Sequence, residues 1–226
     1  MPSALGGYAN MLPHVVMTVV LVSLSASLHE FGHAYAAYKC GDTTAKDAGR
    51  LTPNPLAHID PFGSVMLPLL LSLSSGAYIA YAKPVPYNPN RLAGGRRDEA
   101  IVALAGPVMN LLQAIVGAAV VRLLIQFAPQ LLRETMVSDV LLRYVMVNIS
   151  LMIFNLLPVP PLDGSKLVLP LLKGSAYERY HSLQRHALPI LLVVLYVIPE
   201  FTGFDPVGEI IGGLGSRIFY LLMGIS

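Results

Sequence analysis

MLPHVVMTVVLVSLSASLHEFGHAYAAY, residues 11–38, is an apolar stretch of helical length with three titratable side chains towards its end. A helix of this length can cross the roughly 30 Å hydrocarbon core of a membrane. An ionisable residue inside such a span costs about 2.5–3.5 kcal/mol on insertion scales. His29, Glu30 and His33 therefore imply a compensating function, and the stretch predicts a membrane helix that carries a functional site.

The spacing of these three residues indicates metal chemistry. His29 and His33 are four residues apart, so in a helix they share one face, where two imidazoles can bind one metal ion. His29-Glu30-Phe31-Gly32-His33 is the HExxH pattern of zinc hydrolases, in which the glutamate is the general base. The alternative is a pair of buried histidines bonded to the backbone or to Glu30, which the membrane cost of an unpaired cluster disfavours.

The whole chain has the composition of a membrane protein. Its 226 residues are 54% apolar and 12% charged, whereas a soluble domain is about 25% charged. Apolar segments lie at about 11–38, 64–82, 100–127, 140–157, 188–198 and 207–223. The first, third, fourth and last are long enough to cross a membrane, and the fifth crosses only if its helix begins earlier, near Ser182. We expect an all-α polytopic membrane protein, a helical bundle of five to six apolar segments.

Charge predicts how the chain is oriented. The net charge of +2 indicates no nucleic-acid partner. Lys and Arg gather in three loops, formed by Lys39, Lys46 and Arg50, by Lys83, Arg91, Arg96 and Arg97, and by Lys166, Lys173, Arg179 and Arg185. By the positive-inside rule all three loops are cytoplasmic and the N-terminus is outside.

The second apolar segment conflicts with this orientation if it crosses the membrane. A full crossing by residues 64–82 would place the basic loop from Lys83 to Arg97 outside. We therefore predict a re-entrant or hairpin segment at about 64–82, broken around residues 72–76, where protein or a water-filled cavity covers the non-helical backbone. The alternative is a plain tilted span with a basic exterior loop.

Asp163 is the best candidate for a third metal ligand, since a catalytic zinc site usually has three protein ligands and an open position for water. It follows the fourth apolar segment, where Pro158, Pro160 and Pro161 end the helix and let the chain turn back. With a hairpin at 64–82, the first and fourth segments run the same way, so Asp163 approaches the same side as Glu30. The alternative role of Asp163 is the N-cap of a following helix.

The loop after the first segment contains weaker candidates. Asn54-Pro55 and Asp60-Pro61 are turn signals, so we expect Asn54 and His58 to have structural or substrate-contact roles. Residues 43–52 have moderate strand character, and a short β element at about 43–56 would offer an edge to an extended substrate. A solvated loop is the alternative for this stretch.

Together these motifs resemble the site-2 protease family of intramembrane zinc metalloproteases, peptidase family M50, in its compact prokaryotic form without a PDZ domain. The resemblance covers about residues 21–174. It rests on residues 29–33, on 54–55 with 58–61, on 82–86, on 105–110 and on 155–164. One departure is Ser165, which stands where a second glycine is common.

The resemblance implies roles for individual residues. His29, His33 and Asp163 would bind one Zn²⁺ per chain, with Glu30 as the base. Asn155 would lie near the metal as a donor to the oxyanion, with an interhelical structural bond as its alternative. Gly106-Pro107 would begin a helix, and Asn110 would hydrogen-bond across to the first helix, with an ordinary helix contact as the alternative. Independently of the resemblance, Asn148 in the fourth segment is expected to be a snorkelling or an interhelical hydrogen-bonding group.

The resemblance also implies an activity. Residues 1–226 would form a single membrane-embedded protease domain, with a catalytic core at about 11–174 and accessory helices at about 180–226. It would lie in the lipid bilayer of a prokaryotic cell, with the active site towards the cytoplasm. Its substrate would be a membrane protein with a transmembrane helix, and a homo-oligomer is left open.

Two other functions compete with this one. An inactive membrane scaffold of the same fold predicts the loss of a ligand or of the base, whereas all four candidates are present. A metal transporter or sensor needs ionisable groups along a path across the bilayer, whereas this cluster lies at one depth.

Overall fold

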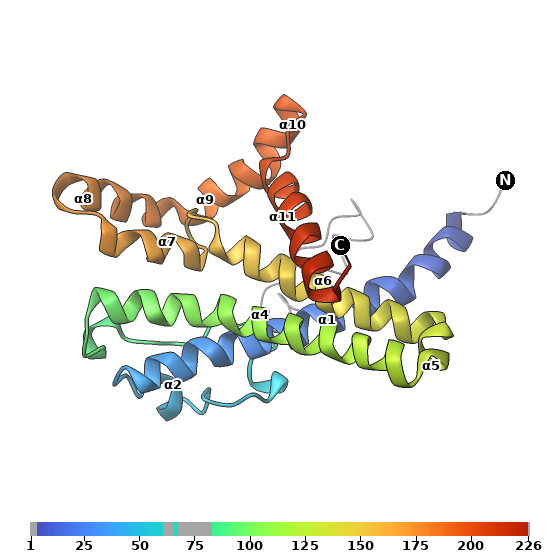
Figure 1. The fold of residues 1–226 in the computed structure, drawn as a ribbon. Helices are drawn as coiled ribbons and strands as arrows, with labels where there is room; N and C mark the ends of the chain where they lie inside the picture. The colour runs from blue at the N-terminus through green and yellow to red at the C-terminus, as the bar shows by residue number, and fades with distance from the viewer. Residues whose placement is uncertain (1–3, 61–65, 67–82, 226) are drawn as a thin grey trace.

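The computed structural model describes residues 4–60, 66 and 83–225, and within them it is a helical bundle without strands (Figure 1). Three long helices form its centre: α1 (Ala4–Lys39), α4 (Arg96–Phe127) and α6 (Thr135–Leu156). α4 packs against both α1 and α6, and α11 (Pro206–Met223) packs mainly against α6. α1 also packs against α6, so the three central helices contact one another, and α11 lies against α6 and α4.

Four helical stretches are long and apolar enough to cross a membrane: Pro13–Lys39, Arg96–Phe127, Met136–Leu156 and Gly174–Thr202. The first three correspond to the first, third and fourth apolar segments. The chain is thus an all-α, polytopic integral membrane protein, as the sequence predicts.

The fourth stretch contains the fifth apolar segment, and it does begin before residue 182. It consists of α8 (Gly174–Leu183), η5 (Gln184–His186), α9 (Ala187–Leu192), the π-helical turn η6 (Val193–Val197) and α10 (Ile198–Thr202). The last apolar segment forms α11, an 18-residue helix. α11 carries Glu209 and Arg217 and is not among the four membrane-length stretches.

The directions of the helices bring distant parts of the sequence together. α1 and α6 run one way and α4 runs the other, with α5 (Pro129–Arg133) between α4 and α6 (Figure 1). The C-terminal ends of α1 and α6 therefore lie at the same end of the bundle. The sequence predicts this relation for the first and fourth apolar segments.

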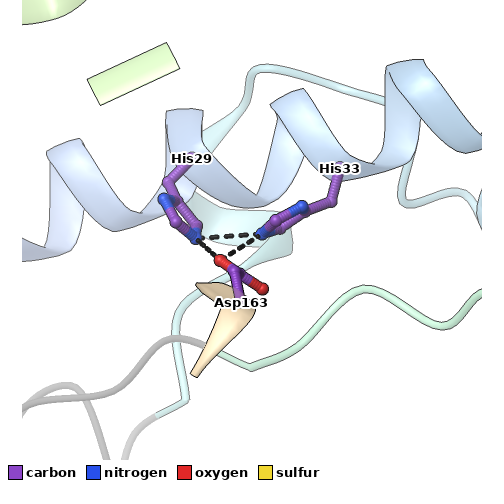
Figure 2. Close-up of side chains that lie close together, drawn as sticks. All are labelled: His29, His33 and Asp163. Carbon is purple, nitrogen blue, oxygen red and sulfur yellow. Dashed lines mark hydrogen bonds and ion pairs between the residues drawn. The ribbon is translucent and has the colours of Figure 1, made fainter. Parts of the chain in front are cut away.

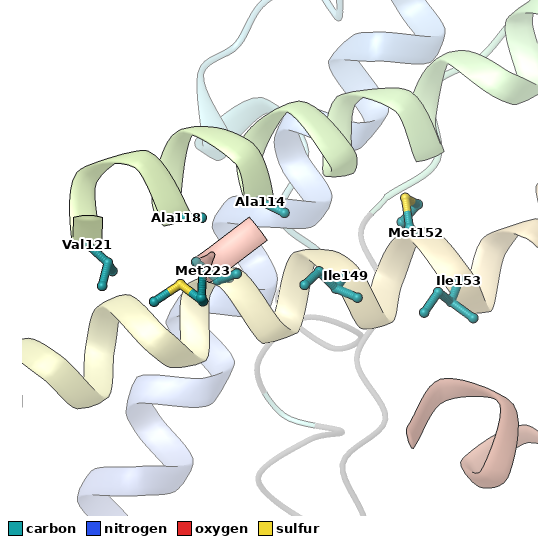
Figure 3. Packing of buried hydrophobic residues seen from close by; sticks show 8 residues of the cluster. Ala114, Ala118, Val121, Ile149, Met152, Ile153 and Met223 are labelled. Atoms are coloured by element: carbon teal, nitrogen blue, oxygen red, sulfur yellow. The ribbon is translucent and has the colours of Figure 1, made fainter. Parts of the chain in front are cut away.

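Small, branched and methionine side chains form the largest apolar core among the described residues, between α4, α6 and α11 (Figure 3). Its buried members are Ala114, Ala118, Val121, Val145, Ile149, Met152, Ile153 and Met223. Gly117 lies within this contact, because a Cβ there would be 3.0 Å from the Val145 side chain. Small residues allow helix backbones to approach closely in a membrane, where dispersion contacts drive packing.

Residues 43–56 form no strand, so the predicted short β element is wrong. Residues Thr44–Asp47 form a single helical turn, α2, and Pro55–Ala57 form a 3-10 turn, η1. The buried Asp42 carboxylate accepts hydrogen bonds from the Thr44 N–H at 3.0 Å and the Thr44 hydroxyl at 2.5 Å. Such local side-chain bonds favour a turn over a ladder.

Asp42 also ties this turn to the chain that precedes α4. Its second oxygen accepts the Asn88 N–H at 2.6 Å. Burial alone would raise the pKa of Asp42, but the hydrogen bonds from Thr44 and Asn88 hold that pKa below its usual range. The carboxylate therefore remains charged and joins the end of α1 to residues 88–91.

The hairpin predicted at about 64–82 lies outside the described residues. The residues that flank it lie side by side, because the Lys83 N–H donates to the His58 carbonyl at 2.8 Å. The Arg50 guanidinium donates to the Lys83 carbonyl, also at 2.8 Å. Residues 58 and 83 are therefore neighbours. A hairpin between them requires its two ends to be this close.

Candidate metal centre

Three side chains from distant parts of the chain converge beside α1 (Figure 2). His29 and His33 project from one face of α1, and Asp163 is the first residue of α7 (Asp163–Val168). One Asp163 oxygen lies 3.2 Å from His29 Nε2 and 3.1 Å from His33 Nε2, and the two Nε2 atoms are 2.9 Å apart. The structure therefore brings together all three residues that the sequence proposes as ligands.

The prolines after α6 deliver Asp163 to this position. α6 ends at Leu156, and Leu157 is extended, as expected for a residue before a proline. α7 then begins at Asp163 itself, with Leu162 at the N-cap position, so the structure does not use the Asp163 side chain as a cap. A Cβ at Gly164 would lie 2.2 Å from the Leu156 carbonyl oxygen, so glycine lets α7 start directly against the end of α6.

Each imidazole has a hydrogen-bond partner on the side away from the cluster. His33 Nδ1 lies 2.7 Å from the Val102 carbonyl oxygen, which can only accept, so this nitrogen carries the proton. His29 Nδ1 lies 2.5 Å from the Asn110 side-chain oxygen. Partners of this kind orient metal-binding histidines and leave Nε2 free to coordinate.

The donor set fits zinc. Two imidazole nitrogens and one carboxylate oxygen are ligands that Zn²⁺ accepts, and at zinc distances of about 2.0–2.1 Å tetrahedral ligands are about 3.3 Å apart. The three atoms here are 2.9–3.2 Å apart. His29 and Asp163 are buried, with 7% and 8% of their surface exposed. A cation between these atoms would balance a carboxylate and two lone pairs that otherwise face one another.

The backbone of α4 forms a wall against the two imidazoles. A Cβ at Gly106 would lie 2.4 Å from His33 Nε2 and 2.6 Å from His29 Cε1. The expectation that Gly106-Pro107 begins a helix is wrong, because both residues lie well inside α4. Proline is tolerated within membrane helices, where neighbours satisfy the freed backbone groups. The glycine is needed here for close approach.

We expect Gly106→Ala to lower zinc affinity about 10–100-fold, as for other changes that misplace a ligand. The added methyl would occupy space held by both imidazoles. Competition with a chromogenic chelator measures the affinity, and thermal unfolding shows that the bundle persists. Gly212→Ala is the matched control, since nothing lies within 4 Å of a Cβ there. Wild-type zinc affinity in Gly106→Ala would contradict the described packing.

Glu30 is held beside the cluster by the chain that follows residue 82. Its Oε2 accepts the Val85 N–H at 2.7 Å, and Val85 is buried near Ala34 and Ala45. The motif at residues 82–86 predicts no role for Val85 itself. A signal was nevertheless present, because Pro84 and Pro86 have no N–H and leave Val85 as the single donor between them.

Asn155, His58 and Asn54 each make a side-chain hydrogen bond within their own segment of the chain. Asn155 donates its amide to the Leu151 carbonyl in its own helix, at 3.0 Å. His58 is buried and bonds to the Thr52 carbonyl at 2.8 Å, and Asn54 accepts the Leu56 N–H at 3.1 Å. The structure thus places His58 and Asn54 in the turns that hold this loop.

Asn110 and Asn148 do bond between helices. The Asn110 amide of α4 donates to the Asn148 side-chain oxygen of α6 at 3.0 Å. Asn110 therefore touches α1 through His29 and α6 through Asn148. Sequence reasoning expected an interhelical contact for each residue but did not place them in one chain of bonds.

A sequence model of peptidase family M50 matches residues 17–140 and 123–198 of this chain. The chain belongs to peptidase family M50. The resemblance to site-2 proteases drawn from its motifs is thereby confirmed. Family membership and the donor set together support the predicted Zn²⁺ cofactor.

Curated relatives of this M50 peptidase cover most of its length. It is 34% identical to "Putative zinc metalloprotease YwhC" of Bacillus subtilis (strain 168), over 84% of this chain and 83% of the relative. It is 31% identical to "Putative zinc metalloprotease Rip2" of Mycobacterium tuberculosis (strain ATCC 25618 / H37Rv), over 84% of this chain and 70% of the relative. No solved structure gives a significant match.

Proposed function

We propose that this M50 peptidase is a zinc metalloendopeptidase that cleaves a peptide bond within a transmembrane segment of a membrane-protein substrate. The observation that carries the proposal is the convergence of His29, His33 and Asp163 beside Glu30, within a bundle of membrane-length helices. His29, His33 and Asp163 would hold the zinc ion, which would supply Lewis-acid chemistry and lower the pKa of a bound water to about 7.

Glu30 is the general base of this reaction. The Val85 N–H holds one of its oxygens at 2.7 Å, which fixes the carboxylate and leaves the other oxygen to accept a proton. Glu30 would take the proton of the attacking water and pass it to the leaving amide nitrogen. Asn155 has a second amide hydrogen beyond the one given to Leu151, and we assign it to the developing oxyanion.

The burial of the site restricts what can react there. His29 and Asp163 are almost fully covered by protein. A transmembrane helix keeps its carbonyls in internal hydrogen bonds, so the substrate has to unwind locally before a carbonyl can reach the site. We therefore expect helix-breaking residues near the cleaved bond.

The competing functions fit less well. A scaffold that has lost activity does not account for the presence of all four groups, three of which (His29, His33 and Glu30) are held by specific partners. Within the described residues, the one cluster able to hold a metal is His29, His33 and Asp163. A transporter would instead need such groups along its path. All four groups come from one chain, so the proposal does not require a second copy.

We expect the site to face the cytoplasm. Cysteines introduced at Asp47 and Asn90 should react with a membrane-impermeant maleimide from the cytoplasmic side, in a Cys40→Ser background. Both positions are exposed and lie at the end of the bundle where α1 stops, since Asp47 is 4.0 Å from Arg91. A cysteine at exposed Gln130, in α5, is the control for the opposite side.

These labelling patterns decide between arrangements. Reaction of positions 47 and 90 from opposite sides would contradict the hairpin. Reaction of both from outside would reverse the orientation but keep the fold. The activity itself is tested by replacing Glu30 with Gln and recovering the membrane proteins that then accumulate at full length.

A further inference from the structure

A histidine binds metal through Nε2 only when that nitrogen has no proton, so its Nδ1 must carry one. For His33, the Val102 backbone carbonyl can only accept, so it requires the proton to be on Nδ1. For His29 the partner is the side-chain amide of Asn110, which presents an acceptor in one orientation and a donor in the other. Something else must hold the Asn110 amide in the orientation that accepts.

Asn148 does so from α6. Its amide nitrogen lies 3.0 Å from the Tyr144 carbonyl oxygen and 3.0 Å from the Ser25 hydroxyl, and its oxygen lies 3.0 Å from the Asn110 amide nitrogen. Asn110, Asn148 and Ser25 are fully buried. Both polar atoms of the Asn148 side chain therefore have protein partners.

Only one orientation of the Asn148 and Asn110 amide groups satisfies all of these hydrogen bonds. A backbone carbonyl can only accept, so the Asn148 atom next to the Tyr144 carbonyl is the nitrogen. The Asn148 oxygen then faces Asn110, which has to present its nitrogen there and its oxygen to His29. His29 Nδ1 must therefore donate, and its Nε2 keeps a lone pair directed at Asp163.

We infer that Asn148 is a positioning residue that, through Asn110, holds His29 in the tautomer that can bind metal. This chain of hydrogen bonds starts at the Tyr144 backbone carbonyl, which a substitution of the Tyr144 side chain does not remove. The inference rests on the proposed function only in treating His29 as a zinc ligand.

The test compares Asn148→Leu with Tyr144→Phe in the full-length chain. Leucine has a similar volume but frees Asn110 to turn its nitrogen towards His29, so Nδ1 should lose its proton to Nε2. Two-bond ¹H–¹⁵N correlations of the histidine rings in metal-free protein report this directly. Zinc affinity, from chelator competition, should fall about 10–100-fold. Tyr144→Phe removes the bond from its hydroxyl to Gln113 but keeps the carbonyl, so both readouts should stay near wild type.

A double variant, Asn110→Asp with Asn148→Leu, separates positioning from packing. A carboxylate at 110 has only acceptors, so it should restore the Nδ1 proton of His29 and recover most of the zinc affinity without Asn148. If Asn148→Leu does not fold, the ring spectrum of the wild-type chain remains as the test, because it shows directly whether His29 Nδ1 carries the proton.

Several results would overturn the inference. These are an unprotonated Nδ1 on His29 in the wild type, an unchanged tautomer and zinc affinity in Asn148→Leu, an equal loss in Tyr144→Phe, or no rescue by the double variant. Failure of the proposed function is distinct, because it appears as a wild-type chain that binds no zinc or cleaves no substrate, whatever the tautomer of His29.

Discussion

We expect Glu30→Gln to abolish most substrate cleavage and to leave one zinc bound per chain. The amide of glutamine has the shape of the carboxylate, and its oxygen can still accept the Val85 N–H. It cannot take a proton from the attacking water. Positioned general bases contribute about 10²–10⁴-fold to a rate, so cleavage should fall by that factor. Elemental analysis of the purified chain measures zinc, and cleavage of a co-reconstituted single-span substrate measures activity.

The control for this substitution is Glu200→Gln. Glu200 is an exposed residue of α10, so its replacement should change neither zinc content nor cleavage. Unchanged cleavage in Glu30→Gln would reject the protease mechanism. Loss of zinc together with cleavage would mean that Glu30 supports the metal site, which is a different role from the base.

Asp163→Ala is expected to remove both zinc and cleavage. The substitution leaves two imidazoles without the oxygen that lies 3.1–3.2 Å from each Nε2. Even the loss of a group that only orients a ligand costs about 10–100-fold in metal affinity, so loss of a ligand should cost at least about 100-fold. Chelator competition measures this loss, and circular dichroism checks that the helices remain.

Asp139→Ala serves as the control for Asp163→Ala. Asp139 makes a partly exposed i,i+4 pair with Arg143, 3.3 Å away, in the first half of α6. Pairs of this kind contribute about 0–1 kcal/mol. Adding Glu30→Gln to Asp163→Ala should cause little further loss, because residues that act as a unit are not additive. Full zinc binding by Asp163→Ala would remove it from the ligand set.

The meeting of His29, His33 and Asp163 could be predicted because each step follows a local rule. Helical periodicity places two histidines four residues apart on one face. Prolines after residue 157 end the helix there. Helix direction in a membrane follows from counting crossings, so it requires no knowledge of side-chain packing.

The errors have equally local causes. The threonines in residues 43–56 indicate strand by propensity, but the Asp42 carboxylate bonds the backbone next to it and sets a helical turn instead. Pro107 indicates a helix start in a soluble protein, whereas in α4 it lies in mid-helix.

The family resemblance predicts that Asn110 bonds to the first helix, but neither its partner His29 nor the Val102 carbonyl behind His33 could be predicted. Both depend on how α4 is rotated and how near it lies to α1. A Cβ at Gly32 would lie 2.7 Å from the Ala105 carbonyl oxygen, which shows how close the two backbones are. This closeness brings Asn110 to His29 and the Val102 carbonyl to His33. Sequence patterns indicate which residues are polar in an apolar helix but not which of them meet.

The ligands of the metal site are synthesised at different times. Its two imidazoles are made early and enter the membrane with α1, but Asp163 follows only after α4 and α6 are complete. Until then the nascent α1 carries its histidines without their carboxylate partner. High-affinity zinc capture should therefore occur late and report that the bundle has assembled, since metal binding is coupled to formation of the folded site.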